Sequence, residues 1–310
     1  MELSILLVQQ IAAMFLTMAV GYAIVKIGLF TVEDSKVISN VVVYICSPCV
    51  VIDSFQIELT PDKIRGLLLS IAASVAVHIL LLAGIRLAEK PLHFNGIEKA
   101  SIIYSNSGYL IIPLVAAVLG SEWVFYTTAY IIVQTILVWT HGISVVNQQQ
   151  TKDYRQIFLN PNLIAIVIGV LLFVMEIRLP VVIGSCVSGF GDMIASASML
   201  VIGMVIGKVD LLWVFQQKRP YLICMFRLVV FPLIVVFAFA FVGRFHVHPD
   251  AEYILMIVLL AAAAPAGAII TQLAQIYNKD SMYASVINVM SVVFCIITMP
   301  LMTLLYETIF

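Results

Sequence analysis

Two hydrophobic segments of this chain carry helix-breaking residues at corresponding places in its two halves. One reads SNSGYLIIPLV over residues 105–115 and contains Gly108 and Pro113. The other reads AAAAPAGAIITQ over residues 261–272 and contains Pro265 and Gly267. Proline removes a backbone donor and glycine permits unusual dihedral angles, so both segments are predicted to be broken helices. Interrupted membrane helices in matching positions of two halves predict a binding site near the bilayer midplane.

The composition indicates that lipid is the main solvent of this chain. Of its 310 residues, 63% are hydrophobic and 11% are charged, against roughly 25% charged residues in a soluble domain. The net charge of −1 gives no reason to expect a nucleic-acid partner. The first apolar run has no basic region before it and is too long for a cleaved signal, so it is predicted to be a permanent helix.

A helix needs about 20 mostly apolar residues to cross a bilayer. By that measure the sequence predicts an all-α polytopic membrane protein with ten transmembrane helices. These candidate spans are residues 4–29, 37–57, 67–87, 100–119, 124–146, 163–174 with its flanks, 183–206, 221–242, 253–274 and 282–305.

The basic residues of the connections predict the orientation of these spans. If the N-terminus is outside, eleven Lys and Arg fall in cytoplasmic connections and four outside, while Arg227 lies within a span. Because cytoplasmic loops carry the excess of basic residues, both termini are predicted to be outside.

Five spans precede a polar linker and five follow it. An odd number of spans per half means that the second half begins on the opposite side of the membrane and is predicted to be inverted. The predicted domains are a first five-helix repeat over residues 1–146, a cytoplasmic linker over 147–158 and a second, inverted repeat over 159–310. The broken helices are the fourth and the ninth spans.

Six stretches of the chain, in this order, resemble one known family. They are YICSPCVVIDSF (44–55), SNSGYLIIPLV (105–115), NPNLIAIVIGVLL (160–172), FGDMIASASMLVIGMVIG (190–207), FRLVVFPLIV (226–235) and AAAAPAGAIITQLAQIYNKD (261–280). On these motifs the chain resembles the auxin efflux carrier family in its bacterial form, similar to malonate and other organic-acid permeases. Many bacterial members carry an asparagine a few residues after the span-nine proline, where this chain has Ile269 and Ile270.

The resemblance implies a secondary transporter in the bacterial inner (plasma) membrane. It implies that spans four and nine cross at their breaks and that a substrate binds beside the crossing. Spans three to five and eight to ten would move against a scaffold of spans one, two, six and seven, in an elevator type of alternating access. The substrate implied is a small organic anion, either a dicarboxylate or an auxin-like aromatic carboxylate. A homodimer through the scaffold is also implied.

Several polar residues at the breaks are candidate ligands. Asn106 and Ser107 precede Gly108, and an amide in lipid needs a partner, which a substrate or the broken backbone can supply. Tyr109 either lines the cavity or packs. Thr271 and Gln272 follow the second break and either bind the substrate or bond between helices. Free N–H groups at half-helix N-termini suit a carboxylate, whereas exposed carbonyls suit a cation.

Three charged residues lie within spans. Arg227 either pairs with a substrate carboxylate or with Asp192 or Asp53, or it forms a structural ion pair or snorkels to the cytoplasmic surface. Asp53 and Asp192 either couple transport to protons or lie in solvated mouths of the protein. A coupling ion, H⁺ or Na⁺, therefore remains possible, and no other cofactor is expected.

The sequence predicts neither a metal site nor an enzymatic activity. Cys46 and Cys49 form a C-x-x-C, but no second cysteine pair or nearby histidine completes a metal site. Residues 189–192 spell G-F-G-D, as in membrane aspartyl proteases, but the second aspartate with a matching context is missing. The alternatives that remain are an ion channel, which needs a continuous polar pore, and a ligand sensor built on a carrier fold.

Overall fold

The computed structural model describes residues 2–147, 155, 158–207, 210–245 and 247–310. Within these residues the regular structure is helical, apart from one isolated antiparallel bridge between Ser105 and Ala266. The all-α prediction is confirmed for this part of the chain. The predicted linker over 147–158 lies almost wholly outside the described residues.

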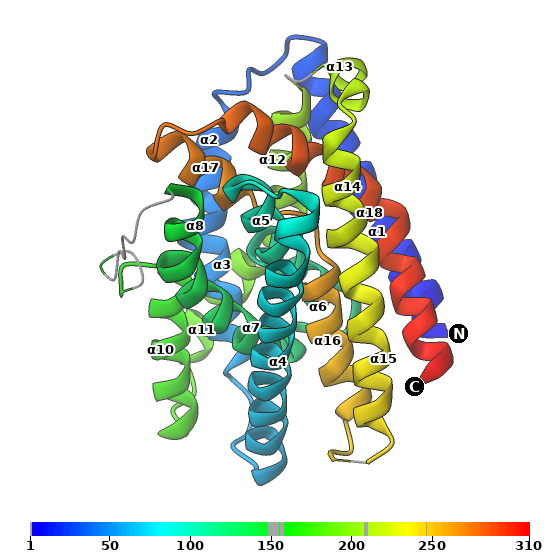
Figure 1. The fold of residues 1–310 in the computed structure, drawn as a ribbon. Helices are drawn as coiled ribbons and strands as arrows, with labels where there is room; N and C mark the ends of the chain where they lie inside the picture. Colours follow the sequence, from blue (N-terminus) through cyan, green and yellow to red (C-terminus); the bar gives the residue numbers. More distant parts are fainter. Residues whose placement is uncertain (1, 148–154, 156–157, 208–209, 246) are drawn as a thin grey trace.

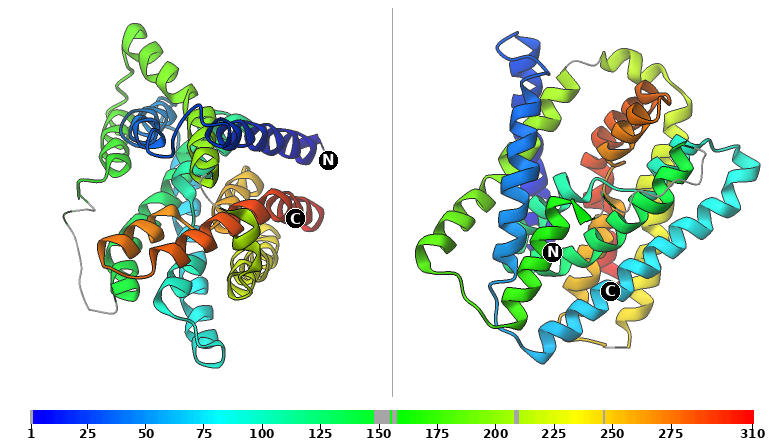
Figure 2. Two further views of the ribbon diagram at one scale, coloured as in Figure 1. Left: turned by 90° about the horizontal axis from the view of Figure 1, so that it is seen from above. Right: turned by 90° about the vertical axis from the view of Figure 1, so that its left-hand side faces the viewer.

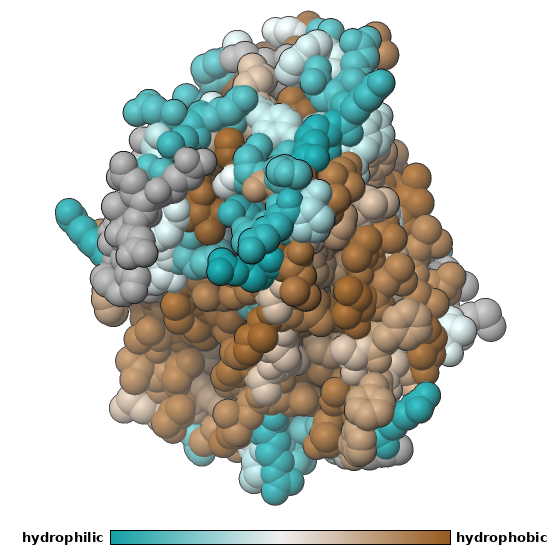
Figure 3. Space-filling view, in the orientation of Figure 1, coloured by the Kyte–Doolittle hydropathy of each residue, from teal (hydrophilic) through white to brown (hydrophobic). Residues whose placement is uncertain are grey.

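Among the described residues, six helices are long and apolar enough to cross a membrane, and they run Ser35–Ser54, Pro61–Leu92, Ser121–Asn147, Val181–Gly207, Arg219–Gly243 and Ser281–Ile309. Figure 3 shows a broad belt of hydrophobic surface between two hydrophilic ends, as expected for lipid contact. Together these features make the chain a polytopic membrane protein.

The elements follow one another along the chain as Figure 1 labels them. They are α1 (Glu2–Lys26), α2 (Ser35–Val41), η1 (Val42–Cys46), α3 (Ser47–Ser54), α4 (Pro61–Leu92), α5 (Gly96–Ile103), η2 (Ser107–Ile111), α6 (Ile112–Val118), η3 (Ser121–Trp123), α7 (Val124–Leu137), η4 (Val138–Gly142), α8 (Ile143–Asn147), α10 (Pro161–Val174), α11 (Val181–Asp192), α12 (Ile194–Gly207), α13 (Leu211–Gln216), α14 (Arg219–Met225), η5 (Phe226–Val230), α15 (Phe231–Gly243), α16 (Ala251–Ala263), α17 (Ala268–Ile276) and α18 (Ser281–Ile309).

The helices pack as two bundles. In the first bundle α1 lies along α12, and α3 packs against α10 and α11. In the second bundle α4 packs against α7 and α16, while α18 packs against α14, α15, α16 and α17. Seen from above, these groups occupy different sides of the molecule (Figure 2).

Glycines let α1 and α12 approach closely. A Cβ built on Gly203 would lie only 1.9 Å from the carbonyl oxygen of Met18, and one on Gly21 would lie 2.3 Å from that of Leu200. Small residues at helix contacts are typical of membrane proteins, where close backbone packing replaces the hydrophobic effect as the source of association.

Proline shapes three of the four five-residue π-helical turns in the described residues. Pro48, Pro113 and Pro232 are each the second residue of the helix that follows η1, η2 and η5. A proline cannot donate to the carbonyl four residues before it, and its ring crowds that carbonyl. A locally wider turn relieves both problems and keeps the helix continuous.

The fourth predicted span breaks earlier than its proline indicates. Helical dihedral angles end at Ile103, Tyr104 is extended with φ −101° and ψ 123°, and the helix restarts at Ser107. Pro113 lies inside the second half-helix, where it accompanies η2 rather than a break. Gly108 lies in the first turn of that half-helix. The ninth predicted span breaks where expected, because Pro265 and Gly267 lie in the non-helical segment between α16 and α17.

Candidate functional site

The two breaks cross each other and are joined through their backbones. The N–H of Asn106 donates to the carbonyl of Pro265 at 2.9 Å, and the N–H of Gly267 donates to the carbonyl of Tyr104 at 2.9 Å. A Cβ on Gly267 would lie 2.9 Å from the carbonyl oxygen of Ser105, so glycine permits this approach. The crossing is therefore a short antiparallel bridge inside an otherwise helical protein.

Gln134 of α7 satisfies the backbone of the first break. Its Oε1 accepts from the N–H of Ser105 at 2.9 Å and from the Ser105 hydroxyl at 2.7 Å. Its Nε2 donates to the Ser105 carbonyl and to the Ser107 hydroxyl, both at 2.9 Å. Broken backbone inside a membrane is tolerated only where such partners exist.

Two residues of α18 do the same for the second break. The N–H of Ala266 donates to the Ser291 hydroxyl at 3.0 Å, and Asn288 Nδ2 donates to the Ala266 carbonyl at 2.6 Å. Each break thus has a dedicated partner from the helix that follows it in its own half. The sequence reasoning missed Gln134, Asn288 and Ser291, although lone polar residues in apolar spans were the available signal.

A cavity of about 310 Å³ lies directly beside the crossing. Residues from both breaks line it, and so do the last turn of α2 with η1, the first turn of α10 and the facing side of α7 and η4. The polar lining residues are Ser39, Asn40, Tyr44, Ser105, Asn106, Ser107, Gln134, Thr135, Trp139, Asn160, Asn162 and Gln272. The lining contains no Asp, Glu, Lys or Arg among the residues that the structure describes.

Two half-helix N-termini meet at this cavity. The continuous helix η2–α6 begins at Ser107 and α17 begins at Ala268, and both residues line the cavity. The first N–H groups of a helix lack intrahelical partners and carry a partial positive charge. The cavity therefore has a positive electrostatic character without a charged side chain.

Asn106 is the polar residue best placed to contact a ligand. Asn106 lines the cavity and has 6% of its surface exposed. Its side-chain amide forms no hydrogen bond to any described residue. The amide lies at the cavity wall with hydrogen-bonding groups that the described residues do not use, so these groups are available to a ligand.

The structure brings together only some of the predicted ligands. Asn106, Ser107 and Gln272 line the cavity, as does Gly267. Thr271 lies on the same helix as Gln272 but not on the cavity wall. The side chain of Tyr109 lies outside the described part of the structure.

The three charged candidates lie away from the cavity. Arg227 is fully buried, and its guanidinium bonds to backbone carbonyls instead of facing the cavity. Asp53 lies in the last turn of α3 and Asp192 ends α11, and neither lines the cavity. Within the described residues no group of three or more His, Cys, Asp or Glu is placed to hold a metal ion.

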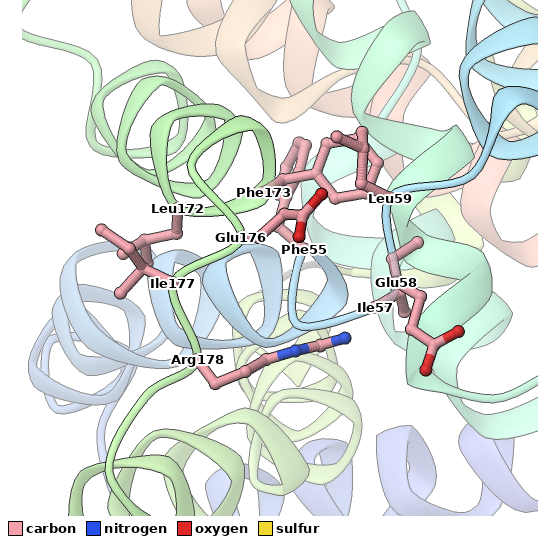
Figure 4. A pocket seen from close by; sticks show the side chains of 9 residues that line it. All are labelled: Phe55, Ile57, Glu58, Leu59, Leu172, Phe173, Glu176, Ile177 and Arg178. Atoms are coloured by element: carbon pink, nitrogen blue, oxygen red, sulfur yellow. The ribbon is translucent and has the colours of Figure 1, made fainter.

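A second cavity, of about 380 Å³, lies at the opposite end of the first bundle. Figure 4 shows Phe55 and Phe173 on one side of it and Arg178 extending toward the segment that holds Glu58. The Arg178 guanidinium donates to the carbonyl of Gln56, which ties the two connections together. None of the residues of the crossing lines this cavity.

These features define a polytopic helical membrane protein with a polar cavity at two crossed helix breaks. A family model described as membrane transport protein matches residues 6–154 and 145–303. The chain therefore belongs to this family, which confirms the resemblance to auxin efflux carriers and makes the protein a membrane transporter. A search of curated proteins found no match.

Proposed function

We propose that this protein is a secondary transporter of a small organic anion, either a dicarboxylate or an aromatic carboxylate. The observation that carries the proposal is the uncharged polar cavity onto which two half-helix N-termini open. Free N–H groups and positive dipole ends bind carboxylates at other helix N-termini. The amides of Asn106 and Gln272 would donate further hydrogen bonds to the same carboxylate.

The proposed architecture is ten spans in two inverted five-helix repeats. The helices supply ten candidate passes, with the broken ones, α5–α6 and α16–α17, in the fourth and ninth places. The partners of the two breaks support the inversion, because Gln134 follows the first break as Asn288 and Ser291 follow the second.

The proposed mechanism is alternating access of elevator type. The first bundle corresponds to spans one, two, six and seven, and the second to spans three to five and eight to ten. The cavity lies between them, since Ser39, Asn40, Asn160 and Asn162 come from the first bundle and the crossing from the second. A sliding of the second bundle would carry the crossing along the first.

The described conformation corresponds to a cavity that faces the cytoplasm. The lining residues Ser39 and Asn40 lie in the last turn of α2, toward the end of the molecule where Figure 1 shows α13. By the excess of basic residues this end is cytoplasmic and both termini are outside. We place the protein in the bacterial inner membrane, with a homodimer through the first bundle as its assembly.

The test is a thermal-shift screen of the purified protein against organic acids, with and without sodium and across pH. A ligand that binds only the folded state raises the Tm. We expect a carboxylate to raise the Tm of the wild type and of Thr271→Ala, whose side chain is off the cavity wall. Asn106→Ala and Gln272→Ala should weaken that response by about tenfold each, roughly 1.4 kcal/mol.

Two results would contradict the proposal. A response to neutral solutes or cations, with none to any carboxylate, would overturn the substrate class. Equal responses of Asn106→Ala, Gln272→Ala and the wild type would remove the binding site from the crossing.

A further inference from the structure

Arg227 is a charged residue that the proposed substrate site does not use. It lies in the π-helical turn η5 of the eighth helical pass and is 0% exposed. A buried charge is costly unless fixed partners replace its hydration. The residue therefore needs an explanation within the protein interior.

The hydrogen bonds of the guanidinium go to backbone carbonyls, and the Tyr130 side chain also lies beside it. Nε donates to Ala264 at 2.8 Å, and Nη2 to Ala261 at 3.4 Å. Nη1 donates to Ile102 at 2.9 Å and to Ile103 at 3.4 Å. No carboxylate of the described residues forms an ion pair with it.

These carbonyls belong to two helix ends that meet at the crossing. Ile102 and Ile103 end α5, and Ala261 and Ala264 lie at the end of α16. The C-terminus of a helix carries a partial charge of about −0.5, so two such ends together approach −1. One guanidinium offsets that charge and also satisfies carbonyls that have no intrahelical partner.

We infer that Arg227 is a positioning residue that serves as the internal counter-cation of the crossing. It holds the C-terminal ends of both first half-helices, and thereby fixes where the second half-helices begin at the cavity. It occupies carbonyl oxygens that would otherwise be free to bind a metal cation. This inference deepens the proposed function, on which its link to transport rests, because it assigns the cation at the crossing to the protein rather than to sodium.

The geometry explains why arginine suits this position. The planar guanidinium presents donors in several directions, so that Nε and Nη1 reach carbonyls of different helices. A lysine has the same charge but a single nitrogen on a flexible stem, and it cannot hold both helix ends in the same way. We therefore expect the charge and the shape of the Arg227 side chain to make separate contributions to the stability of the crossing.

The experiment measures thermal unfolding of the purified full-length protein in sodium, potassium or choline chloride, without any organic anion. We expect the wild type to melt at the same temperature in all three salts. Arg227→Met, which is apolar and fills much of the space, should lower the Tm by roughly 5–10 °C, and Arg227→Lys should lower it by less. Arg227→Ala leaves room for an ion, so millimolar guanidinium or sodium should restore part of its Tm.

Arg219 supplies the matched control. Its guanidinium also donates to backbone carbonyls, those of Leu92 and His93. However, Arg219 is the first residue of α14, its side chain is half-exposed, and it forms an ion pair with Glu98. Arg219→Ala should lose stability without gaining any response to guanidinium or sodium. Such a contrast separates the internal cation of the crossing from an arginine that only stabilises a helix end.

Two outcomes would overturn the inference. One is a wild-type protein that sodium stabilises relative to choline. The other is an Arg227→Met variant that melts like Arg227→Lys, because charge would then be irrelevant at this position. Neither measurement uses a substrate, so failure of this inference is distinguishable from failure of the organic-anion proposal.

Discussion

Replacing Gln134 by leucine tests whether the crossing depends on a side chain from the neighbouring helix. Leucine has a similar size and suits an apolar helix, but it removes all four hydrogen bonds that Gln134 makes to Ser105 and Ser107. The N–H and the carbonyl of Ser105 then lose these partners in a buried position, because Ser105 is 2% exposed.

The magnitude follows from two estimates. Orphaned buried polar groups cost about 1–3 kcal/mol each, which gives roughly 2–6 kcal/mol for the two backbone groups. Hydrogen bonds between membrane helices average only about 0.6 kcal/mol, which gives about 2 kcal/mol for the set. The estimates meet near 2–3 kcal/mol, and at about 2 °C per kcal/mol in a long chain the Tm should fall by about 5 °C.

The assay is thermal unfolding of purified protein, followed by the carboxylate thermal-shift screen on the same samples. Gln272→Leu is the control, since Gln272 lines the same cavity but is exposed and makes no hydrogen bond to a described residue. It should keep the wild-type Tm and lose only the ligand response.

A Gln134→Leu protein that melts within 1 °C of the wild type, on the scale of the shifts above, would refute this reasoning. It would show that the extended segment at Ser105 holds its conformation through the bridge to Ala266 alone.

Three further substitutions test other parts of the structure. Gly203→Ala should cost about 1–3 kcal/mol by pushing α12 from α1, whereas Gly189→Ala, whose Cβ would meet nothing within 4 Å, should be nearly neutral in the same unfolding assay. Glu98→Gln should cost about 1–2 kcal/mol, because a 2%-exposed carboxylate loses a charge-assisted bond to a partner that water can still reach; an unchanged Tm would contradict this. Ser291→Ala removes the acceptor of the Ala266 N–H and should lower the Tm, though by less than Gln134→Leu, which loses four hydrogen bonds. A larger loss for Ser291→Ala would contradict this ranking of the two side chains.

The place of the second break could be predicted from the sequence, whereas for the first only the existence of a break could be predicted and not its place. Pro265 and Gly267 lie in the non-helical segment because proline and glycine act through their own backbone. The break at Tyr104 is set by tertiary partners instead, since Ser105 has no local reason to leave a helix and is held by Gln134. Pro113 produces a π-helical turn there, which local sequence rules do not distinguish from a break.

The role of Arg227 was hidden from the sequence for a related reason. A search for partners among charged side chains suggests a carboxylate or a substrate anion. The partners found are carbonyls of α5 and α16, and every residue has a carbonyl, so no residue type marks them. The position of Asn106 at the cavity could be expected from the sequence because its amide is a polar group in an apolar span, whatever its neighbours are, and its role as a ligand stays a prediction.

The two breaks solve one physical problem with different side chains, and this difference bears on how the site works. Gln134 alone satisfies both backbone groups of Ser105, while Ala266 needs Ser291 for its N–H and Asn288 for its carbonyl. Under the proposed inverted-repeat architecture, we expect both halves to satisfy the backbone of their break, whichever side chains do so, because an unsatisfied backbone group in lipid is costly. The free amide of Asn106 is then the exception among the polar groups of the crossing. Since the backbone there is already satisfied without it, its hydrogen-bonding capacity is left for a ligand.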